Sequence, residues 1–258
     1  MKVLGIIPAR MAATRFPNKP MALIEGMPMI GHCYFRSKMC NLLDEVYVAT
    51  CDKEIYDYIS KLGGKVIMTS DMHERATERS SEALLNIENE VLGTTYDIVV
   101  MIQGDEPLIN PLMINEVVQP LLEGKNEVSN LMARLKDLAE AENPNFVKVV
   151  TATNGRALYM SREPIPSPTK YNKTIEYYRQ LGLIAFTREA ILSFVKFPTT
   201  RLEIIESVDM NRFLENQVSI QMSVTDFEAD SVDTVEDLAI VSGKMKTDLL
   251  FSKYNSKQ

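Results

Sequence analysis

The sequence predicts an α/β fold with a mostly parallel central sheet. Short apolar runs of strand length recur over roughly the first 150 residues, and helical patterns lie between them. The runs lack a regular apolar–polar alternation, which indicates strands that are covered on both faces. Because crossovers between parallel strands are right-handed, we expect the loops after these strands along one edge of the sheet, where α/β proteins bind ligands.

The expected strands and helices alternate along the chain. The strands are Val3–Ile7, Glu45–Ala49, Lys65–Met68, Ile98–Ile102 and Val147–Thr151. The helices are Met29–Met39, Lys53–Leu62, Glu78–Asn89 and Asn110–Leu122. Asp52 is suited to cap the second helix, and Gly63-Gly64 is suited to end it. The alternation implies helices on both faces of the sheet.

The pattern changes near residue 150. Arg162–Asn172 contains three prolines and is predicted to be a loop. Tyr171–Phe197 is rich in aromatic and aliphatic residues, so it is either an insertion that packs on the sheet or a subunit contact. We therefore expect one domain over residues 1–246, with an inserted arm at about residues 155–200.

The C-terminal part is predicted to add a strand and a helix. Ser219–Thr225 alternates like a strand, and Val235–Lys246 has a helical pattern with Thr234 as its cap. Residues 247–258 are polar and contain lysines, so they are predicted to form a flexible tail.

Composition argues against several functional classes. The chain has 258 residues and a net charge of −7, so it lacks the overall basic charge that nucleic-acid binding favours. No stretch approaches the ~20 consecutive apolar residues that a membrane span needs. The three cysteines and two histidines match no zinc pattern. The odd cysteine count and the missing secretory signal predict reduced thiols in the cytoplasm.

The loop after the first strand carries the clearest functional signal. Pro8–Lys19 contains several small residues and three cations, Arg10, Arg15 and Lys19. Small residues let a backbone approach a ligand closely, and the positive charges suit a polyanion such as a triphosphate. The loop matches neither the GxxxxGK[ST] phosphate-binding pattern nor the GxGxxG dinucleotide pattern.

Two acidic residues are candidate metal ligands. Asp105 follows the apolar strand Ile98–Ile102, and Gly104 permits a tight turn beside it. A carboxylate at that position can hold Mg²⁺ against substrate phosphates, although a plain strand-to-helix turn explains Asp105 equally well. Asp233 precedes the helix that starts at Val235, so it is either a second ligand or only part of a helix start.

A polar loop leads into a further candidate, Thr77-Glu78-Arg79, at the start of a predicted helix. A helix N-terminus can accept an anionic or polar ligand group. An ordinary charged first turn is the simpler explanation of these residues. His73 in the preceding loop is either a ligand contact or, more commonly, a solvated histidine.

Nine segments in order resemble the 3-deoxy-manno-octulosonate cytidylyltransferases, also called CMP-Kdo synthetases. They are Ile6–Pro20 (with IIPAR and TRFPNKP), Pro28–His32, Val46–Thr50, Thr77–Arg79, Gln103–Ile109 (QGDEPLI), Asn143–Val150, Ala157–Pro166, Arg179–Leu183 and Val232–Leu238. They span about residues 3–242, and the ordered set is far more specific than any single segment.

The resemblance implies a three-layer, Rossmann-like nucleotidyltransferase fold with an inserted dimerisation arm, and hence a homodimer. It implies transfer of CMP from CTP to the anomeric hydroxyl of a 3-deoxy-2-ulosonic acid, with release of pyrophosphate. In such a reaction, positioning and charge stabilisation dominate catalysis. The product would serve the synthesis of lipopolysaccharide or another surface glycan.

The resemblance also implies roles for single residues. The nucleotide and its phosphates would be contacted by Ala9, Arg10, Arg15, Lys19, Thr77, Arg79 and Gln103. Asp105 and Asp233 would hold the cofactor Mg²⁺. Arg10, Lys19 and Asp105 would be the catalytic residues. Arg162 would pair with the carboxylate of the acidic sugar, since a guanidinium suits bidentate binding.

The residues on the sugar side depart from the family pattern. Gln180 stands where the family has His, and Ile184 where it usually has Tyr. Asp209 and Met210 replace a Glu and a Gln. We assign these four residues to substrate binding. Because discrimination of a hydroxylated sugar depends on such hydrogen-bonding groups, the changes predict a deoxygenated, amino-substituted or otherwise modified Kdo, or Kdo itself with compensating residues elsewhere.

Other functional classes stay open. A catalytically silent nucleotide-binding homologue is one, although the retained acids and loop cations argue against it. A cytidylyltransferase for a nonulosonic acid is another, but the matches at Gln103–Ile109 and Ala157–Pro166 favour the octulosonate branch. Ala76, where the family usually has Gly, is expected to restrict the approach of the backbone to the nucleotide. We expect CTP and an acidic sugar as ligands, and neither nucleic acid nor a membrane as a partner.

Overall fold

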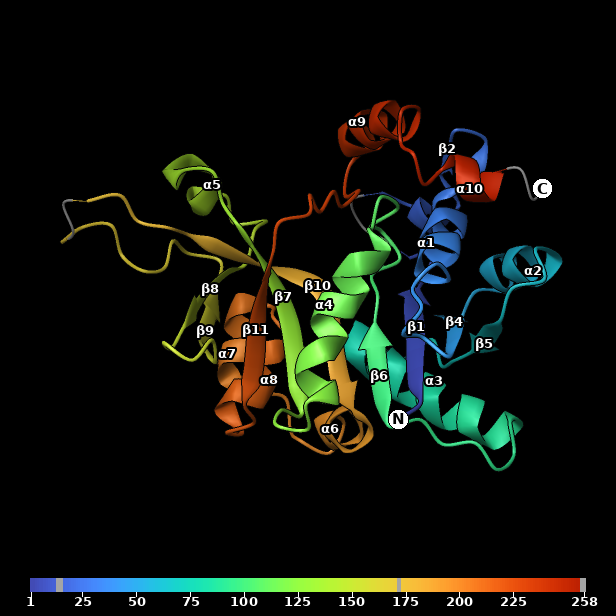
Figure 1. The fold of residues 1–258 in the computed structure, drawn as a ribbon, viewed down its shortest axis with the longest axis horizontal. Helices are drawn as coiled ribbons and strands as arrows, with labels where there is room; N and C mark the ends of the chain where they lie inside the picture. Colours follow the sequence, from blue (N-terminus) through green and yellow to red (C-terminus); the bar gives the residue numbers. More distant parts are fainter. Residues whose placement is uncertain (13–15, 171–172, 256–258) are drawn as a thin grey trace. The chain divides into compact units, whose positions relative to one another are not determined.

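A computed structural model gives the fold and describes residues 1–12, 16–170 and 173–255. The chain forms two compact units (Figure 1). Unit 1 comprises Met1–Asn115 and Ala229–Gln258, and unit 2 comprises Glu116–Glu228. The boundaries between the units fall inside the predicted single domain of residues 1–246, so that domain assignment stays a prediction.

Unit 1 is built around four parallel strands. β1 (Val3–Ala9) lies between β6 (Ile98–Met101) and β4 (Glu45–Thr50), and β5 (Val66–Met68) pairs with the far side of β4. All seven residues of β1 are buried. The four strands lie within a few residues of their predicted positions, which confirms the parallel sheet expected from the apolar runs.

Helices α1, α2 and α3 pack on this sheet. The helices of unit 1 are α1 (Met29–Ser37), α2 (Lys53–Lys61), α3 (Ala76–Glu90), α9 (Val235–Met245) and α10 (Ser252–Asn255), and α4 (Pro111–Leu122) starts in this unit. The one-turn helix η1 (Lys19–Met21) leads into a hairpin of β2 (Leu23–Ile24) and β3 (Met27–Pro28). The alternation of strands and helices confirms the α/β class.

The two predicted helix caps have different outcomes. Thr234 caps α9, since its hydroxyl accepts the Asp237 N–H at 3.1 Å. Asp52 occupies the position before α2, but its carboxylate accepts the Met11 N–H at 2.8 Å and makes no capping bond. A tertiary partner therefore displaces the local cap that the sequence predicts.

The C-terminal segment, which the sequence predicts to be a flexible tail, contains a short helix. Ser252–Asn255 forms α10, and Tyr254 is 2% exposed. Asp248 forms an ion pair with Arg36, and the Tyr254 hydroxyl lies 2.8 Å from Nδ1 of His32. Polar groups of the described part of this segment have buried partners on α1, and the flexibility of residues 247–258 stays a prediction.

Unit 2 contains a second group of strands with mixed direction. β7 (Val128–Arg134) pairs in parallel with β11 (Ile220–Thr225) and antiparallel with β10 (Tyr178–Thr187). β8 (Lys148–Thr151) pairs antiparallel with β10 and with β9 (Ala157–Ser161). Its complete helices are α5 (Leu138–Glu142), α6 (Arg188–Phe194), α7 (Arg201–Glu206) and α8 (Met210–Glu215).

The predicted arm at residues 155–200 supplies β9, β10 and α6 to unit 2. Several of its apolar residues are core residues, and Phe186 and Phe194 are fully buried. Packing within the unit therefore explains part of the aromatic pattern of this segment. Its role as a dimerisation arm stays a prediction.

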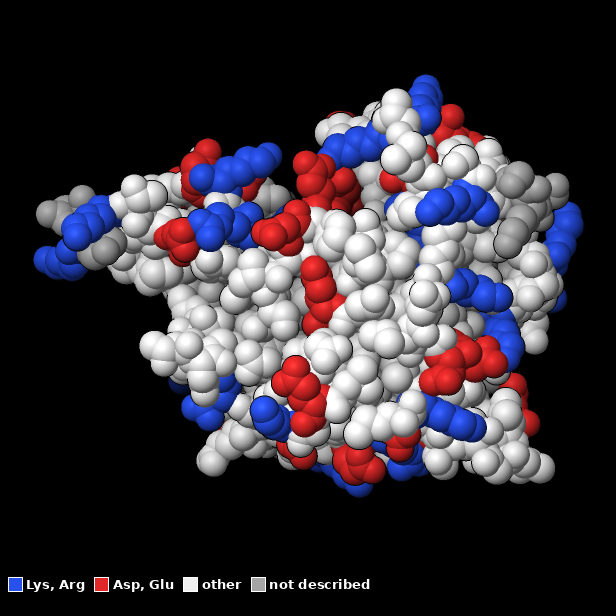
Figure 2. All heavy atoms as spheres, viewed as in Figure 1, with Lys and Arg blue, Asp and Glu red and all other residues white. Residues whose placement is uncertain are grey.

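The surface carries both signs of charge. On the face that Figure 2 displays, basic side chains lie interspersed with acidic ones over the described residues. Every helix in the described part of the chain is too short or too polar to span a membrane.

Candidate functional site

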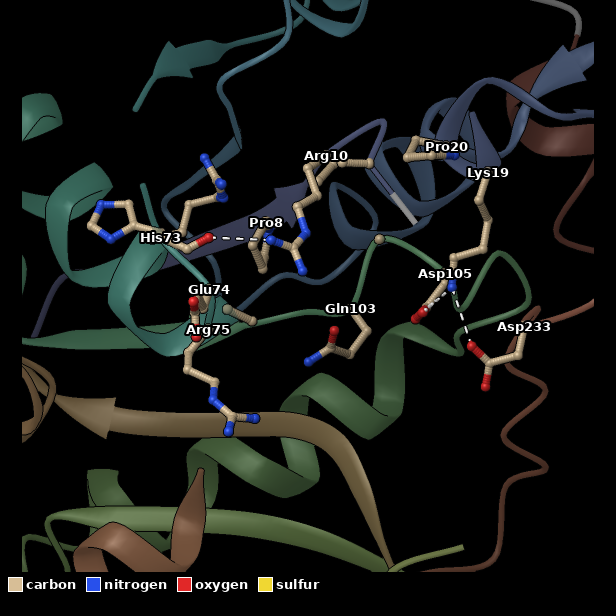
Figure 3. A pocket seen from close by; sticks show the side chains of 15 residues that line it. Pro8, Arg10, Lys19, Pro20, His73, Glu74, Arg75, Gln103, Asp105 and Asp233 are labelled. Carbon is tan, nitrogen blue, oxygen red and sulfur yellow. Dashed lines mark hydrogen bonds and ion pairs between the residues drawn. The ribbon is translucent and has the colours of Figure 1, made fainter. Parts of the chain in front are cut away.

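A cavity of about 360 Å³ opens in unit 1 where β1 and β6 end, at the edge where the sequence predicts a ligand site. The predicted site residues that line it are Ala9, Arg10, Lys19, Arg79, Gln103, Asp105 and Asp233 (Figure 3). They come from five separate stretches of the chain. The fold thus gathers most of the predicted nucleotide and metal residues into one place.

Within this lining, the Lys19 ammonium lies between two carboxylates (Figure 3). Its Nζ donates to Asp105 Oδ2 at 2.6 Å and to Asp233 Oδ1 at 3.3 Å. Burial acts to lower the Lys19 pKa, but the negative charges and hydrogen bonds of Asp105 and Asp233 outweigh it, so the pKa lies above its ordinary value. The lysine is therefore charged at neutral pH and partly neutralises the acidic pair.

Backbone contacts hold these three side chains together. Gly104 lets the loop after β6 lie against β1, since an added Cβ would lie 3.0 Å from the Pro8 carbonyl oxygen. The Val232 N–H donates to the Asp105 carbonyl at 2.9 Å, which brings Asp233 beside Asp105. The chain enters η1 through Asn18, whose left-handed φ of 61° directs it toward Lys19.

The loop after β1 presents Arg10 at the cavity. Arg10 is exposed, and its Nη1 donates to the His73 carbonyl at 3.3 Å. The bond from the Met11 N–H to Asp52 fixes the same loop to the end of β4. Arg15, the third predicted cation, lies outside the described residues. A guanidinium at an open cavity edge is suited to bind a phosphate.

Two residues at the start of α3 have different surroundings. Arg79 is 3% exposed; its Nη1 donates to the Thr69 hydroxyl at 2.6 Å and to the Ser70 carbonyl at 3.0 Å, while its Nη2 has no hydrogen-bond partner among the described residues. Thr77 is fully buried, and its hydroxyl lies 3.9 Å from the Met101 sulfur. Thr77 is not among the described residues that line the cavity.

The segment before α3 supplies residues that sequence reasoning assigned weakly or missed. His73, Glu74 and Arg75 line the cavity, and the His73 ring is hydrogen-bonded to the Glu82 carboxylate. Burial acts to raise the Glu82 pKa, but the Ser70 N–H and His73 outweigh it and lower the pKa. The signal that identified Asp105 was its position just after a strand. Asp52 has the same kind of position after β4.

The predicted sugar-side residues lie in unit 2. Gln180 and Ile184 belong to β10, and Asp209 and Met210 stand at the start of α8. Ile184 is 3% exposed and Met210 is fully buried, so both belong to the core of this unit. Neither side chain carries a hydrogen-bonding group, and the assignment of the four residues to substrate binding stays a prediction.

The altered motif on β10 has an irregular backbone. Gln180 faces Met132 of β7 and Ile184 faces Asn130, so the register shifts between them. The buried Asn130 amide donates to the carbonyls of Leu181 at 2.8 Å and Leu183 at 3.0 Å. An asparagine on the neighbouring strand thus satisfies carbonyl groups that the irregularity removes from the ladder.

Arg162 is held by its own unit. Its guanidinium donates to the carbonyls of Glu206 at 2.6 Å, Pro144 at 2.7 Å and Ser207 at 3.3 Å. The Glu206 carboxylate accepts the Arg162 N–H at 2.8 Å. Burial acts to raise the Glu206 pKa, but hydrogen bonds from the Arg162 backbone N–H and the Tyr159 and Ser161 hydroxyls outweigh it and lower the pKa. In this structure Arg162 fastens the end of α7, and its pairing with a sugar carboxylate stays a prediction.

Asp105 and Asp233 fit a hard divalent cation. Mg²⁺ is commonly bound by one or two carboxylates together with substrate phosphates and water. The Lys19 ammonium already stands between the two carboxylates as a cation. No group of three or more His, Cys, Asp or Glu side chains suited to a metal occurs within the described residues. A metal at this pair would therefore take most of its ligands from the nucleotide and water.

Comparison with known proteins identifies the family of this chain. A Cytidylyltransferase family profile matches residues 4–220. A 3-deoxy-manno-octulosonate cytidylyltransferase of Geobacter metallireducens is 40% identical over 256 residues, covering 95% of this chain and 98% of the relative. An 8-amino-3,8-dideoxy-manno-octulosonate cytidylyltransferase of Shewanella pealeana is 38% identical over 253 residues, covering 96% and 100%.

Solved structures agree in fold. A CMP:2-keto-3-deoxy-manno-octonic acid synthetase complexed with CTP superimposes with a TM-score of 0.88 at 33% identity, covering 96% of this chain and 100% of that chain. A glucose-1-phosphate thymidylyltransferase of Bacillus anthracis, described as putative, has a TM-score of 0.66 at 16% identity, covers 95% and 96%, and shares the fold alone. The nucleotidyltransferase fold predicted from the sequence is thereby confirmed. The chain belongs to the cytidylyltransferase family.

Proposed function

We propose that this protein transfers CMP from CTP to the anomeric hydroxyl of a 3-deoxy-2-ulosonic acid and releases pyrophosphate. The observation that carries the proposal is the Lys19–Asp105–Asp233 cluster in a cavity at the end of the parallel strands. A paired set of acids beside cations suits a magnesium–triphosphate complex. The relatives named for this reaction align over nearly the whole chain.

In this proposal the cations of the cavity act on the phosphates. Arg10 and Lys19 neutralise the triphosphate and the charge that develops on the departing pyrophosphate, and Arg15 belongs to the same loop. Arg79 and Gln103 lie near the nucleoside, and Arg79 brings a buried N–H group without a partner among the described residues. The in-line attack needs the sugar hydroxyl on the side of the α-phosphate opposite the leaving group.

Asp105 and Asp233 would hold the cofactor Mg²⁺. When bound, such a cation supplies charge neutralisation at phosphate oxygens and polarisation of the sugar hydroxyl. Lys19 would exchange its carboxylate partners for phosphate oxygens, because it lies within hydrogen-bond reach of both acids. The Lys19 ammonium would then be paired with oxygen atoms both before and after the nucleotide binds.

The sugar is Kdo or a close variant of it. An amino-substituted Kdo is the second candidate, since the Shewanella relative is named for such a sugar and this chain has altered residues on the predicted sugar side. Gln180, Ile184, Asp209 and Met210 are the residues that we assign to this choice, with Arg162 for the carboxylate. The product would serve lipopolysaccharide or another surface glycan, made by a homodimer in the cytoplasm.

Pyrophosphate release with CTP, Mg²⁺ and a panel of ulosonic acids tests this proposal. Sugar-dependent release is expected with Kdo or its 8-amino variant, and Asp105→Asn should lower it at least ~100-fold. Asp57→Asn, which removes an exposed carboxylate of an i,i+4 pair on α2, is the matched control and should keep full activity. Equal rates in the two variants would reject the metal role. No release with any sugar would identify a catalytically silent homologue.

A further inference from the structure

Helix α1 carries two buried polar side chains that the proposed chemistry does not use. His32 is 0% exposed and Arg36 is 1% exposed, and their spacing of four residues puts them on one face of the helix. A buried guanidinium is unfavourable unless it is paired and hydrogen-bonded. The partners of the two side chains therefore indicate what they do.

His32 joins the C-terminal segment to the chain that follows Lys19. Its Nε2 lies 2.8 Å from the Ile24 carbonyl, which can only accept, so Nε2 carries the proton. Nδ1 is then the acceptor for the Tyr254 hydroxyl, 2.8 Å away. Ile24 belongs to the hairpin that begins two residues after η1, the one-turn helix that starts at Lys19.

Arg36 joins the same segment to the chain that follows Asp105. Its Nη1 donates to the carbonyls of Leu108 and Ile109, both at 3.2 Å. Its Nη2 is paired with the Asp248 carboxylate, and its Nε lies 3.4 Å from the Tyr254 hydroxyl oxygen. Four backbone or side-chain oxygens from two segments thus converge on one guanidinium.

The C-terminal segment itself continues from α9, and Asp233 lies two residues before α9. Apolar packing supports the junction, because Ile24, Met29, Val232, Val241 and Met245 form one buried cluster with Phe251 against it. Figure 1 shows α10 beside β2 and α1, in agreement with these contacts. The segments that supply Lys19, Asp105 and Asp233 therefore all meet at the His32–Arg36 face of α1.

We propose that His32, Arg36 and Tyr254 are positioning residues that hold Lys19 opposite Asp105 and Asp233. None of the three is among the described residues that line the cavity. They act through the hairpin after Lys19, the loop after Asp105 and the segment after Asp233. The expected effect on nucleotide binding rests on the proposed function, whereas the expected effect on the position of Lys19 does not.

Tyr254→Phe is the decisive variant, because it deletes the hydroxyl that His32 and Arg36 share and keeps the ring. The matched control is Tyr58→Phe on α2, since the Tyr58 hydroxyl is also buried and has no hydrogen-bond partner among the described residues. Tyr254→Phe should raise the dissociation constant of Mg²⁺·CTP about three- to tenfold and leave the KM for the sugar unchanged. Tyr58→Phe should change neither.

A second measurement reports on the geometry without any ligand. The side-chain NMR resonances of Lys19, labelled at Nζ and Cε, should shift in nucleotide-free Tyr254→Phe and stay in place in Tyr58→Phe. Unmoved Lys19 resonances with unchanged CTP binding would overturn the inference, even if Tyr254→Phe melted at a lower temperature. Failure of the wild-type protein to bind CTP would instead reject the proposed function, and the Lys19 resonances would still decide the positioning role.

Discussion

Replacement of Lys19 by methionine should make the nucleotide-free protein bind divalent cations more tightly. In the structure the ammonium occupies the space between Asp105 and Asp233, at 2.6 Å and 3.3 Å from the nearest carboxylate oxygens. A metal ion that approaches this pair must displace the lysine. Methionine has a similar length and no charge, so it removes the cation that competes with the metal for the two carboxylates.

The size of the effect follows from the surroundings of the pair. The side chains of Lys19, Asp105 and Asp233 are 14%, 26% and 34% exposed, so water screens them only in part. Hydrogen bonds to charged groups in such settings contribute about 1.5–3 kcal/mol. Since about 1.4 kcal/mol corresponds to a factor of ten, Lys19→Met should strengthen metal binding roughly 10- to 100-fold. Binding of Mg²⁺·CTP should weaken, because a phosphate contact is lost.

Titration of Mn²⁺ into the nucleotide-free protein, followed by electron paramagnetic resonance, measures the first effect directly. Calorimetric titration with CTP at saturating Mg²⁺ measures the second. Lys53→Met is the control, because it removes a lysine whose partner Asp57 lies on the surface of α2, with the two side chains 83% and 56% exposed. Unchanged or weaker Mn²⁺ binding by Lys19→Met would refute the competition between lysine and metal.

Three further predictions concern stability and the shape of the site. Gly104→Ala would put a Cβ 3.0 Å from the Pro8 carbonyl oxygen. Denaturant titration should therefore show a loss of about 1–3 kcal/mol in the free energy of unfolding, and CTP binding should weaken. Unchanged stability and CTP binding would contradict the close approach. Burial lowers the His32 pKa below 6.5, so the unfolded chain binds more protons and stability should fall as the pH drops below about 6.5. Urea titrations across that range should show a weaker fall in His32→Gln, and parallel curves would reject the assignment. Glu203→Gln would remove the negative charge from the buried Glu203–Arg212 ion pair, in which the side chains are 0% and 4% exposed. We expect a loss of about 3–5 kcal/mol by denaturant titration, and a loss below about 1 kcal/mol would contradict this.

The sequence predicted unit 1 well because its strands are short apolar runs whose pattern is local. β1 and β4 are buried almost throughout, so composition alone identified them. The rule that loops follow parallel strands along one edge then brought Asp105 near the loop of Arg10 and Lys19. The local context of Asp233 left a metal ligand and a helix start both open, and the resemblance to a family favoured the metal ligand.

Unit 2 was harder because its structure depends on pairing between distant segments. β7 has the sequence VSNLMAR, and the polar Ser129 and Asn130 are fully buried in it. Asn130 is there because it binds carbonyls of β10, which no local pattern reveals. β10 was predicted as part of an aromatic arm, since an antiparallel strand cannot be assigned without its partner.

Side-chain partners were the least predictable feature. Asp52 has the sequence position of a helix cap, yet a backbone N–H from a different loop takes its carboxylate. Arg162 matches a family motif, yet three carbonyls hold its guanidinium. Such choices depend on tertiary neighbours, and the C-terminal segment that contains Tyr254 is a third example.

The most direct test of the proposed activity is the identity of the product. The wild-type protein is incubated with CTP, Mg²⁺ and Kdo, and the phosphorus NMR spectrum is followed with time. The account predicts that the three CTP signals are replaced by one phosphodiester signal of a CMP-sugar and one signal of pyrophosphate, only when the sugar is present. Persistence of the CTP signals with Kdo and with its 8-amino variant, or formation of CMP and pyrophosphate without any sugar adduct, would contradict it.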